Sequence, residues 1–332
     1  MAMKICKINT SMKLVAAALL FSLSHGVYAA TVLKLAYAEN SEPVKQALQY
    51  IGQSVEQKTH GEVQIQYFPD SQLGGERELV EMTQVGAIDL TKVSSGLLES
   101  FSPLYGVFSL PYLFKNQEEF YKVMDDPDIM DPVYQSTETQ GFIGMGWYDS
   151  GARSFYMSKG PVKSIDDLKG KKIRVMQSET SINTMKLLGA SPIAMSQAEV
   201  YTSLQQGIID GAENNEFALT IARHGEVAKY YTYDMHTRIP DIVIMSSLTK
   251  TKLTPAQMKA LQESIHESVE VEKKAWKEEM DKTRDLAKSQ FGVQFFNIDY
   301  APFKKAVQPI YEKLKSKPQV YALYQKISQV SQ

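Results

Sequence analysis

The stretch Gly170-Lys171-Lys172-Ile173-Arg174-Val175-Met176 places an arginine near the end of a short alternating strand. Charged and apolar side chains alternate from Lys172 to Val175, as expected for a strand with one buried face. The Arg174 side chain could leave the sheet there and face a cleft. Further along the chain, Asp210-Gly211-Ala212-Glu213-Asn214-Asn215 is interpreted as a polar turn able to hold a small molecule. If both segments face one crevice, they form an anion receptor.

Strand-like and helix-like segments alternate along most of the chain. Period-two alternation or short apolar runs predict strands at residues 33–37, 63–67, 88–93, 141–148, 172–175 and 208–210. Helices are expected after Pro43, after Gly75, at 181–188 and at 199–206, the last two ending at glycines. The apolar segment 101–114, broken by two prolines, is expected to be a buried loop or short helix. This order predicts an α/β fold with largely parallel sheets.

One long helix is expected near the C-terminal end of this pattern. Thr254-Pro255 is a helix cap followed by a favoured first-turn proline, and no helix-breaking residue follows until Gly292. Apolar residues recur at three- or four-residue multiples between them, which predicts a buried stripe. A helix of this length exceeds one lobe and must span two, although two helices joined by a kink remain the alternative.

Residues 1–30 have the organisation of a signal peptide. Three lysines precede a short apolar run, Leu14 to Leu23, and Val27-Tyr28-Ala29-Ala30 offers small residues for cleavage after Ala29 or Ala30. The apolar run is short for the alternative, an N-terminal membrane anchor. The single cysteine, Cys6, precedes this run, so the mature protein is expected to lack thiols and disulfides. These features predict export to the periplasm.

Composition and motif spacing exclude several function classes. The net charge of −2 gives no basis for nucleic-acid binding. The five histidines are scattered without zinc-ligand spacing, and no nucleophile elbow or phosphate-binding loop occurs. We therefore expect no metal, no cofactor and no enzymatic activity. A carboxylate pair for glycoside hydrolysis remains an alternative, because such pairs have no fixed sequence spacing.

Several long motifs together resemble one protein family, the solute-binding proteins of tripartite ATP-independent periplasmic (TRAP) transporters of the DctP type. The resemblance covers essentially the whole mature chain. The motifs occur in register as Ser71-Gln72-Leu73-Gly74-Gly75-Glu76, Phe108-Ser109-Leu110-Pro111-Tyr112, Gly170 to Val175, Leu188 to Pro192, Ala198 to Gly207 and Asp210 to Asn214.

The resemblance implies a two-lobed periplasmic-binding-protein-like fold with an interlobe cleft and a lobe-spanning helix. We expect residues 31–150 with about 240–279 in the first lobe, and 151–239 with about 280–332 in the second. The implied function is capture of an organic acid by a monomer, followed by delivery to membrane permease subunits driven by a sodium gradient. A periplasmic ligand sensor is the alternative that the sequence does not separate from transport.

The resemblance also assigns an anion site. Arg174 matches the family arginine that pairs with the ligand carboxylate, a role suited to its planar and permanently charged guanidinium. Arg153 matches a second arginine near the same carboxylate, and Asn214 matches an amide on the ligand. Glu76 lies where the family often has an acidic ligand contact.

The remaining candidates bear on which acid is bound. Lys92 interrupts an apolar strand and is followed by Ser94. Gln197 replaces an aromatic that many relatives pack on the ligand, which favours a more polar pocket. Further candidates, in decreasing strength, are Asp241, Tyr148, Glu39 and His236.

This polar set favours a ligand with several hydroxyl groups, because buried polar groups need hydrogen-bond partners. A segment pattern around Gly151-Ala152-Arg153-Ser154 and Met176-Gln177-Ser178 also resembles the hexuronate-binding subgroup. We therefore expect a hexuronate or related sugar acid, with a C4-dicarboxylate or keto acid as the alternative.

Overall fold

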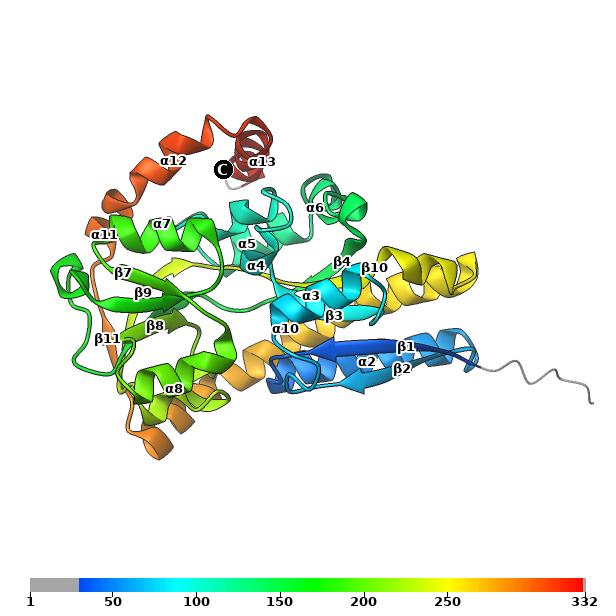
Figure 1. The fold of residues 1–332 in the computed structure, drawn as a ribbon, viewed down its shortest axis with the longest axis horizontal. Coiled ribbons are helices and arrows are strands. Elements are labelled where there is room, and N and C mark those ends of the chain that lie inside the picture. The colour runs from blue at the N-terminus through cyan, green and yellow to red at the C-terminus, as the bar shows by residue number, and fades with distance from the viewer. Residues whose placement is uncertain (1–29, 331–332) are drawn as a thin grey trace, which may run out of the picture.

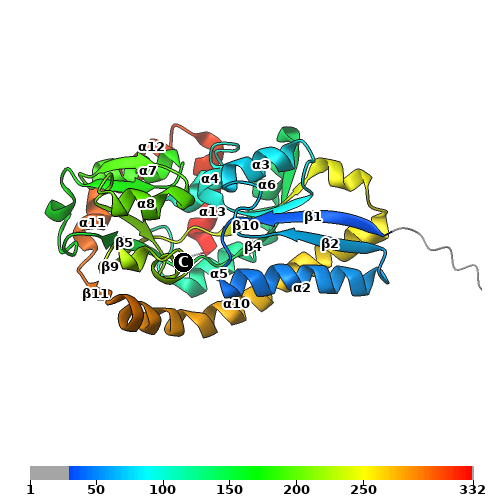
Figure 2. The same cartoon turned by 60° about the horizontal axis from the view of Figure 1, so that its bottom comes forward.

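The chain folds into two lobes, each built on one β-sheet and joined by a helix that runs along both (Figures 1 and 2). A computed structural model describes residues 30–330. The expected leader, with Cys6 and Ala29, lies outside the described residues. Within residues 30–330, no helix is both long and apolar enough to cross a bilayer.

The first lobe contains a five-stranded mixed sheet. In spatial order its strands are β2 (Val63–Phe68), β1 (Thr31–Tyr37), β3 (Leu90–Ser94), β10 (Asp241–Ser246) and β4 (Phe142–Tyr148). β1 is parallel to β2 and β3, but β10 is antiparallel to β3 and β4. The prediction of a largely parallel sheet is therefore wrong here, because β10 enters from the second lobe at the edge where β3 and β4 end.

The second lobe contains a six-stranded mixed sheet. In spatial order its strands are β11 (Gln294–Asn297), β9 (Tyr230–Thr237), β5 (Arg153–Met157), β8 (Gly211–Asn214), β6 (Lys172–Val175) and β7 (Ser191–Ala194). β6 is parallel to β7 and β8, whereas β5 is antiparallel to β8 and β9. The predicted strand at 172–175 is confirmed with these bounds.

The segment around Gly211 corrects two predictions. Residues 208–210 form a turn rather than a strand, and the supposed polar turn at 211–214 is strand β8 inside the sheet. A Cβ at Gly211 would lie 2.3 Å from the Met157 sulfur, so glycine is needed for β8 to approach β5. The Asp210 carboxylate accepts the Lys172 backbone N–H at 2.9 Å, which ties the turn to β6.

Helices cover the faces of both sheets (Figure 1). The first lobe has α2 (Glu42–Lys58), α3 (Glu76–Gln84), α4 (Ser95–Leu98), α5 (Gln117–Met124) and α6 (Pro127–Gln135). The second lobe has α7 (Glu179–Leu187), α8 (Val200–Gln205) and α9 (Phe217–Thr220). The C-terminal part has α10 (Pro255–Phe291), α11 (Ala301–Ala306), α12 (Gln308–Leu314) and α13 (Pro318–Val330).

The long helix α10 is continuous, which confirms one helix rather than a kinked pair. The Thr254 side chain caps its start, and Gly292 ends it in the left-handed conformation at φ 65°. Its 37 residues correspond to about 55 Å at the standard rise of 1.5 Å per residue. α10 packs against α2 and β4 in the first lobe and α9 in the second, so it braces both lobes.

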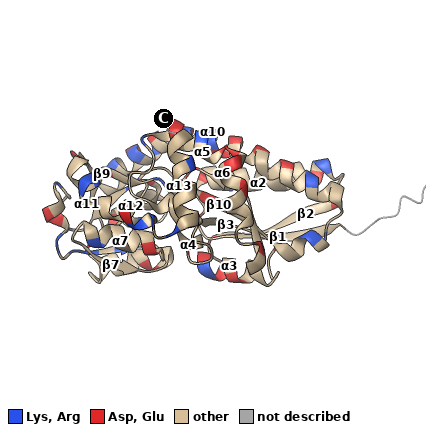
Figure 3. Cartoon of the chain, turned by 90° about the horizontal axis from the view of Figure 1, so that it is seen from above, with Lys and Arg blue, Asp and Glu red and all other residues tan. Residues whose placement is uncertain are grey.

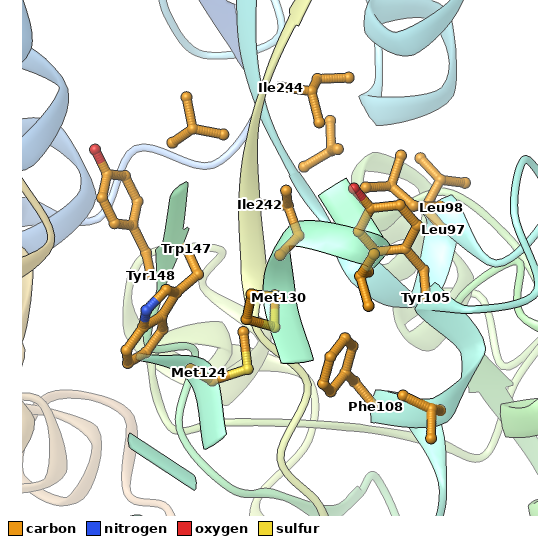
Figure 4. Close-up of a cluster of buried hydrophobic side chains, with 14 of the residues drawn as sticks. Leu97, Leu98, Tyr105, Phe108, Met124, Met130, Trp147, Tyr148, Ile242 and Ile244 are labelled. Atoms are coloured by element: carbon orange, nitrogen blue, oxygen red, sulfur yellow. The ribbon is translucent and has the colours of Figure 1, made fainter. Parts of the chain in front are cut away.

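The first-lobe core surrounds β4 and β10 (Figure 4). Tyr105, Phe108 and Trp147 lie in this core, and residues 105–109 form a buried 3-10 helix, as expected for a short helix in this segment. Tyr148 is also fully buried, and its hydroxyl lies 2.8 Å from the Ser268 hydroxyl of α10. The candidate role of Tyr148 as a ring face in the cleft is therefore wrong, because the side chain faces α10.

The C-terminal segment connects the two lobes at a second place. α11 contacts β9 and α12 contacts α7, but α13 packs against α5, α6 and the 3-10 helix at 105–109 (Figure 1). Residues 318–330 therefore depart from the expected assignment of about 280–332 to the second lobe. The physical reason is that the buried face of α13, with Val320, Leu323 and Ile327, joins the first-lobe core.

A buried carboxyl group lies where α10 passes the lobe crossing. Glu272 is fully buried, and its Oε2 accepts the Asp149 backbone N–H at 3.0 Å. Asp149 belongs to the connection between β4 and β5. Burial raises the pKa of Glu272 well above its ordinary value, and the Asp149 charge raises it further.

We predict that Glu272→Gln becomes progressively more stable than the wild type as pH rises. The folded wild type holds this proton to a higher pH than the unfolded chain, so its stability falls as pH rises toward the folded pKa. Urea unfolding at about pH 5 and about pH 8 should show a relative gain on the order of 1 kcal/mol or more. A gain independent of pH, or equal to that of the exposed Glu118→Gln, would contradict this assignment.

Candidate ligand-binding site

A cavity of about 560 Å³ lies between the two lobes. It is lined at the edges where β1 and β3 of the first lobe and β6 and β8 of the second lobe end. Ligands in α/β proteins characteristically bind beyond the carboxyl ends of parallel strands, and this volume suits a small molecule. Of the sequence-predicted residues, all except Tyr148 and His236 line this cavity.

Lys92 forms the centre of the first-lobe wall. The side chain is 1% exposed, and its Nζ lies 2.7 Å from Asp241 Oδ2 and 3.2 Å from Glu39 Oε2. Burial alone would lower the pKa of Lys92, but Asp241, Glu39 and Glu76 raise it overall. The Lys92 charge is therefore already compensated by the Asp241 and Glu39 carboxylates. These two contacts use two of its three N–H donors, so one donor remains for a ligand.

Glu76 adds a titratable acid to the same wall. It begins α3, and its Oε1 accepts the Ser94 backbone N–H at 3.2 Å. Burial raises the pKa of Glu76 to about 7, because the Lys92 charge offsets the desolvation only in part. The Ser94 hydroxyl donates to the Met176 sulfur at 3.4 Å, and this contact joins the first lobe to the second.

Arg174 supplies the charge on the second-lobe wall. Its Nε and Nη2 donate to the Met195 carbonyl at 3.1 and 2.8 Å, and its Nη1 donates to Gln197 Oε1 at 3.0 Å. The side chain lines the cavity although the residue is only 4% exposed. No aspartate or glutamate among residues 30–330 forms an ion pair with it. Burial lowers the pKa of Arg174, yet a guanidinium remains charged at any physiological pH.

Arg153 differs from Arg174 because it already has a carboxylate partner. Its Nε lies 2.6 Å from Glu213 Oε2, and its Nη2 donates to Glu213 Oε1 at 3.0 Å and to the Glu213 carbonyl at 2.7 Å. Its Nη1 donates to Asn214 Oδ1 at 2.8 Å. Arg153 therefore orients Asn214 and has one N–H left for a ligand.

A buried ionic network continues behind Arg153. His236 Nε2 lies 3.4 Å from Glu213 Oε2, and its Nδ1 lies 2.9 Å from Asp234 Oδ2. Although burial opposes charge on both groups, the pKa of His236 is raised to about 9 by Asp234 and Glu213. The pKa of Glu213 is lowered to about 2 by Arg153 and His236. His236 is thus a support behind the wall rather than a ligand contact.

Among the residues that the sequence reasoning missed are Glu213, which lies behind the second-lobe wall, and His224, which lines the cavity. Glu213 stood inside the quoted Asp210 to Asn214 segment, but its pairing with Arg153 depends on the register of β5 and β8. His224 lines the cavity beside Tyr156, whose hydroxyl is 2.8 Å from Nδ1. Burial and the Arg174 charge lower the pKa of His224 to about 3, so this imidazole is neutral. No local sequence signal identifies it.

No group of three or more His, Cys, Asp or Glu side chains in the described part of the chain could hold a metal ion. Lys and Arg are interspersed with Asp and Glu over both lobes (Figure 3). Among the lysine and arginine side chains that line the cavity, Arg174 alone has no carboxylate within ion-pair distance in the described residues. This arrangement defines a receptor for a small anion with further hydrogen-bonding groups.

Two lobes, a polar interlobe cavity and a bracing helix define a solute-binding protein. The family of bacterial extracellular solute-binding proteins, family 7 (DctP), matches residues 36–317. The chain belongs to this family and is a TRAP solute-binding protein, not an enzyme.

Individual relatives agree with this assignment. An uncharacterized protein of Salmonella typhimurium is 69% identical over 95% of this chain and 96% of its own length. A TRAP solute-binding protein of Anaerococcus prevotii, solved with bound D-glucuronate, is 41% identical with a TM-score of 0.88, covering 90% of this chain and 98% of that one. Another TRAP solute-binding protein, from Xanthobacter autotrophicus with bound β-D-galacturonate, is 34% identical with a TM-score of 0.85. The match covers 89% of this chain and 98% of that one.

We predict that Glu213→Ala lowers the free energy of unfolding by about 3–5 kcal/mol, because it leaves the Arg153 charge buried without its carboxylate. Urea denaturation followed by circular dichroism measures this loss. The matched control is Glu118→Ala, which removes an exposed carboxylate paired with Lys122 at 3.0 Å and should cost less than about 1 kcal/mol. Equal losses in the two variants would show that the Arg153 network does not stabilise the wall.

Proposed function

We propose that the cavity captures a hexuronate, with the ligand carboxylate bound by Arg174. The single observation that carries this proposal is that Arg174 is a buried cation lining the cavity without a carboxylate partner among the described residues. An uncompensated buried charge is costly, and a ligand carboxylate offsets that cost while meeting the planar guanidinium. Three of the five N–H donors are used within the protein, so two remain for the ligand.

The remaining polar groups suit hydroxyls rather than a second charge. Glu76 offers acceptors, Lys92 retains one donor, and the Asn214 Nδ2 has no hydrogen bond to another described residue. A sugar ring presents several hydroxyls that both donate and accept, so it can satisfy these mixed groups together. Such a ligand leaves few buried polar atoms unpaired.

A C4-dicarboxylate is disfavoured by the charge balance. On the first-lobe wall, the carboxyl groups of Glu39, Glu76 and Asp241 surround Lys92. The other lining cation of this wall, Arg77, pairs with Glu81 and donates to Gln177. Burial raises the pKa of Asp241, as it does for Glu76, so added negative charge is already unfavourable there. A second ligand carboxylate beside these three carboxyl groups would face repulsion and desolvation.

Related proteins support the same ligand class. The solved relatives from Anaerococcus prevotii and Xanthobacter autotrophicus hold D-glucuronate and β-D-galacturonate. Their similarity covers both lobes, and therefore both walls of the cavity. The proposed ligands for this chain are accordingly D-glucuronate and D-galacturonate.

The proposed role is delivery of this ligand to the membrane subunits of a TRAP permease. The supporting facts are the family membership and the signal-peptide pattern of residues 1–30. We further propose that the exported protein acts as a periplasmic monomer. Its first lobe would comprise residues 31–150 and about 240–279, and its second lobe 151–239 and about 280–317, with α13 docked on the first.

We predict that Arg174→Ala weakens D-glucuronate binding by about 2–5 kcal/mol, because the ligand carboxylate would be buried without a counter-charge. Isothermal titration calorimetry measures the change in affinity. The matched control is Lys172→Ala, which removes an exposed cation two residues earlier on β6 and should bind like the wild type. Retained affinity in the Arg174 variant would contradict the assigned carboxylate site.

We also predict that the wild type is selectively stabilised by hexuronates. Ligand at about 100 times its Kd should add roughly 2.7 kcal/mol to the free energy of unfolding. A thermal-shift screen should show higher melting temperatures with D-glucuronate and D-galacturonate, and little change with succinate or uncharged D-glucose. Stabilisation by succinate but by neither uronate would overturn the ligand assignment.

A further inference from the structure

The segment Met176–Thr180 comprises the connection from β6 to α7 and the first residues of α7, and it contacts the first lobe through four of its residues. The Ser94 hydroxyl meets the Met176 sulfur at 3.4 Å, and Arg77 Nε donates to Gln177 Oε1 at 2.8 Å. Met176 and Gln177 also line the cavity. The segment therefore connects the strand that carries Arg174 to the opposite lobe.

Glu99, which follows α4 in the first lobe, makes the strongest of these contacts. Its Oε2 accepts the Ser178 hydroxyl at 2.5 Å and the Thr180 backbone N–H at 3.2 Å, and its Oε1 accepts the Thr180 hydroxyl at 2.6 Å. Three bonds to one carboxylate are charge-assisted, and the start of a helix favours a negative charge. One carboxylate thus holds the first turn of α7 from across the lobe boundary.

Ser178 has a second role that links this contact to the helix itself. The residue is 1% exposed, and its hydroxyl oxygen accepts the Ser181 backbone N–H at 3.1 Å as the cap of α7. The same hydroxyl therefore donates to Glu99 and accepts from α7. Without Glu99, the Ser178 hydroxyl would lose its acceptor in the first lobe, and the start of α7 would lose its attachment to that lobe.

Gly106 gives the Glu99 side chain the space it needs. A Cβ at this buried glycine would lie 2.8 Å from the Glu99 Cγ, Cδ and Oε1 atoms. Such distances are too short for any larger residue without movement. The Glu99 side chain therefore packs closely against the 3-10 helix at 105–109. This 3-10 helix also contacts α7.

We propose that Glu99 is a positioning residue that holds the lobes together at this boundary and slows ligand release. It does so through Ser178 and Thr180, four and six residues after the proposed carboxylate-binding Arg174. The link to ligand release rests on the proposed function, whereas the effect on lobe arrangement does not. Glu99 does not line the cavity, so its effect is on the lobes rather than on ligand contacts.

The first test measures lobe arrangement without ligand. Because Cys6 is the only cysteine and lies in the predicted leader, Gln72→Cys and Gln206→Cys can carry spin labels on exposed sites of the two lobes. Double electron-electron resonance should show a larger open population in Glu99→Gln than in the wild type. The matched control is Glu179→Gln, which changes a carboxylate on α7 whose ion-pair partner is Lys317, and should match the wild type. Identical distributions in the Glu99 and Glu179 variants would overturn the proposal.

The second test measures D-glucuronate kinetics by stopped flow. Glu99→Gln should raise the dissociation rate roughly tenfold, because it removes the negative charge from all three hydrogen bonds, with little change in association. Thr180→Val removes only the hydrogen bond from the Thr180 hydroxyl, so it should raise the dissociation rate less than Glu99→Gln does. The effects of the two substitutions should not add in the double variant, because they act on the same contact. An unchanged dissociation rate in both variants would contradict the role in release. Absence of glucuronate and galacturonate binding in the wild type would instead refute the proposed ligand, leaving the ligand-free distances to decide the role of Glu99.

Discussion

The organisation of the cleft depends on one constraint, the burial of the Arg174 guanidinium without a carboxylate partner. Burying an unpaired charge is among the most costly features a fold can contain, so the surrounding groups must limit that cost. The Met195 carbonyl and the Gln197 amide oxygen do so in part, and they also fix the plane of the guanidinium. The protein thus keeps a preoriented cation whose full compensation has to come from a ligand.

The other cations of the cleft show why Arg174 is distinctive. Arg153 is paired with Glu213, and Lys92 is paired with Asp241 and Glu39. The Arg153–Glu213 pair is close to neutral, and Lys92 is outnumbered by the carboxyl groups around it. The cavity can therefore present many polar atoms while attracting only one negative group. This balance supports the proposed preference for a monocarboxylate rich in hydroxyls.

Much of the site could be predicted from the sequence, because the motifs that resemble the DctP family assign Arg174, Asn214 and Glu76 to ligand contacts. The long helix was also predictable, since its cap, its apolar stripe and its terminal glycine are local signals. The separate roles of the two arginines were not, because the pairing of Arg153 with Glu213 depends on a strand register between segments 60 residues apart. Gly-Ala-Glu-Asn also has little strand propensity, so β8 is defined by its neighbours β5 and β6 rather than by its own residues. Tyr148 was misassigned because alternation does not reveal which face of β4 meets α10.

The most direct test of the central claim is a crystal structure of the protein with D-glucuronate. The ligand carboxylate should lie within hydrogen-bonding distance of the Arg174 guanidinium, with the sugar hydroxyls toward Glu76, Lys92 and Asn214. The Arg153–Glu213 and Lys92–Asp241 pairs should remain intact in the complex. A carboxylate bound by Lys92 or Arg153, with Arg174 still contacting only Met195 and Gln197, would contradict the central claim.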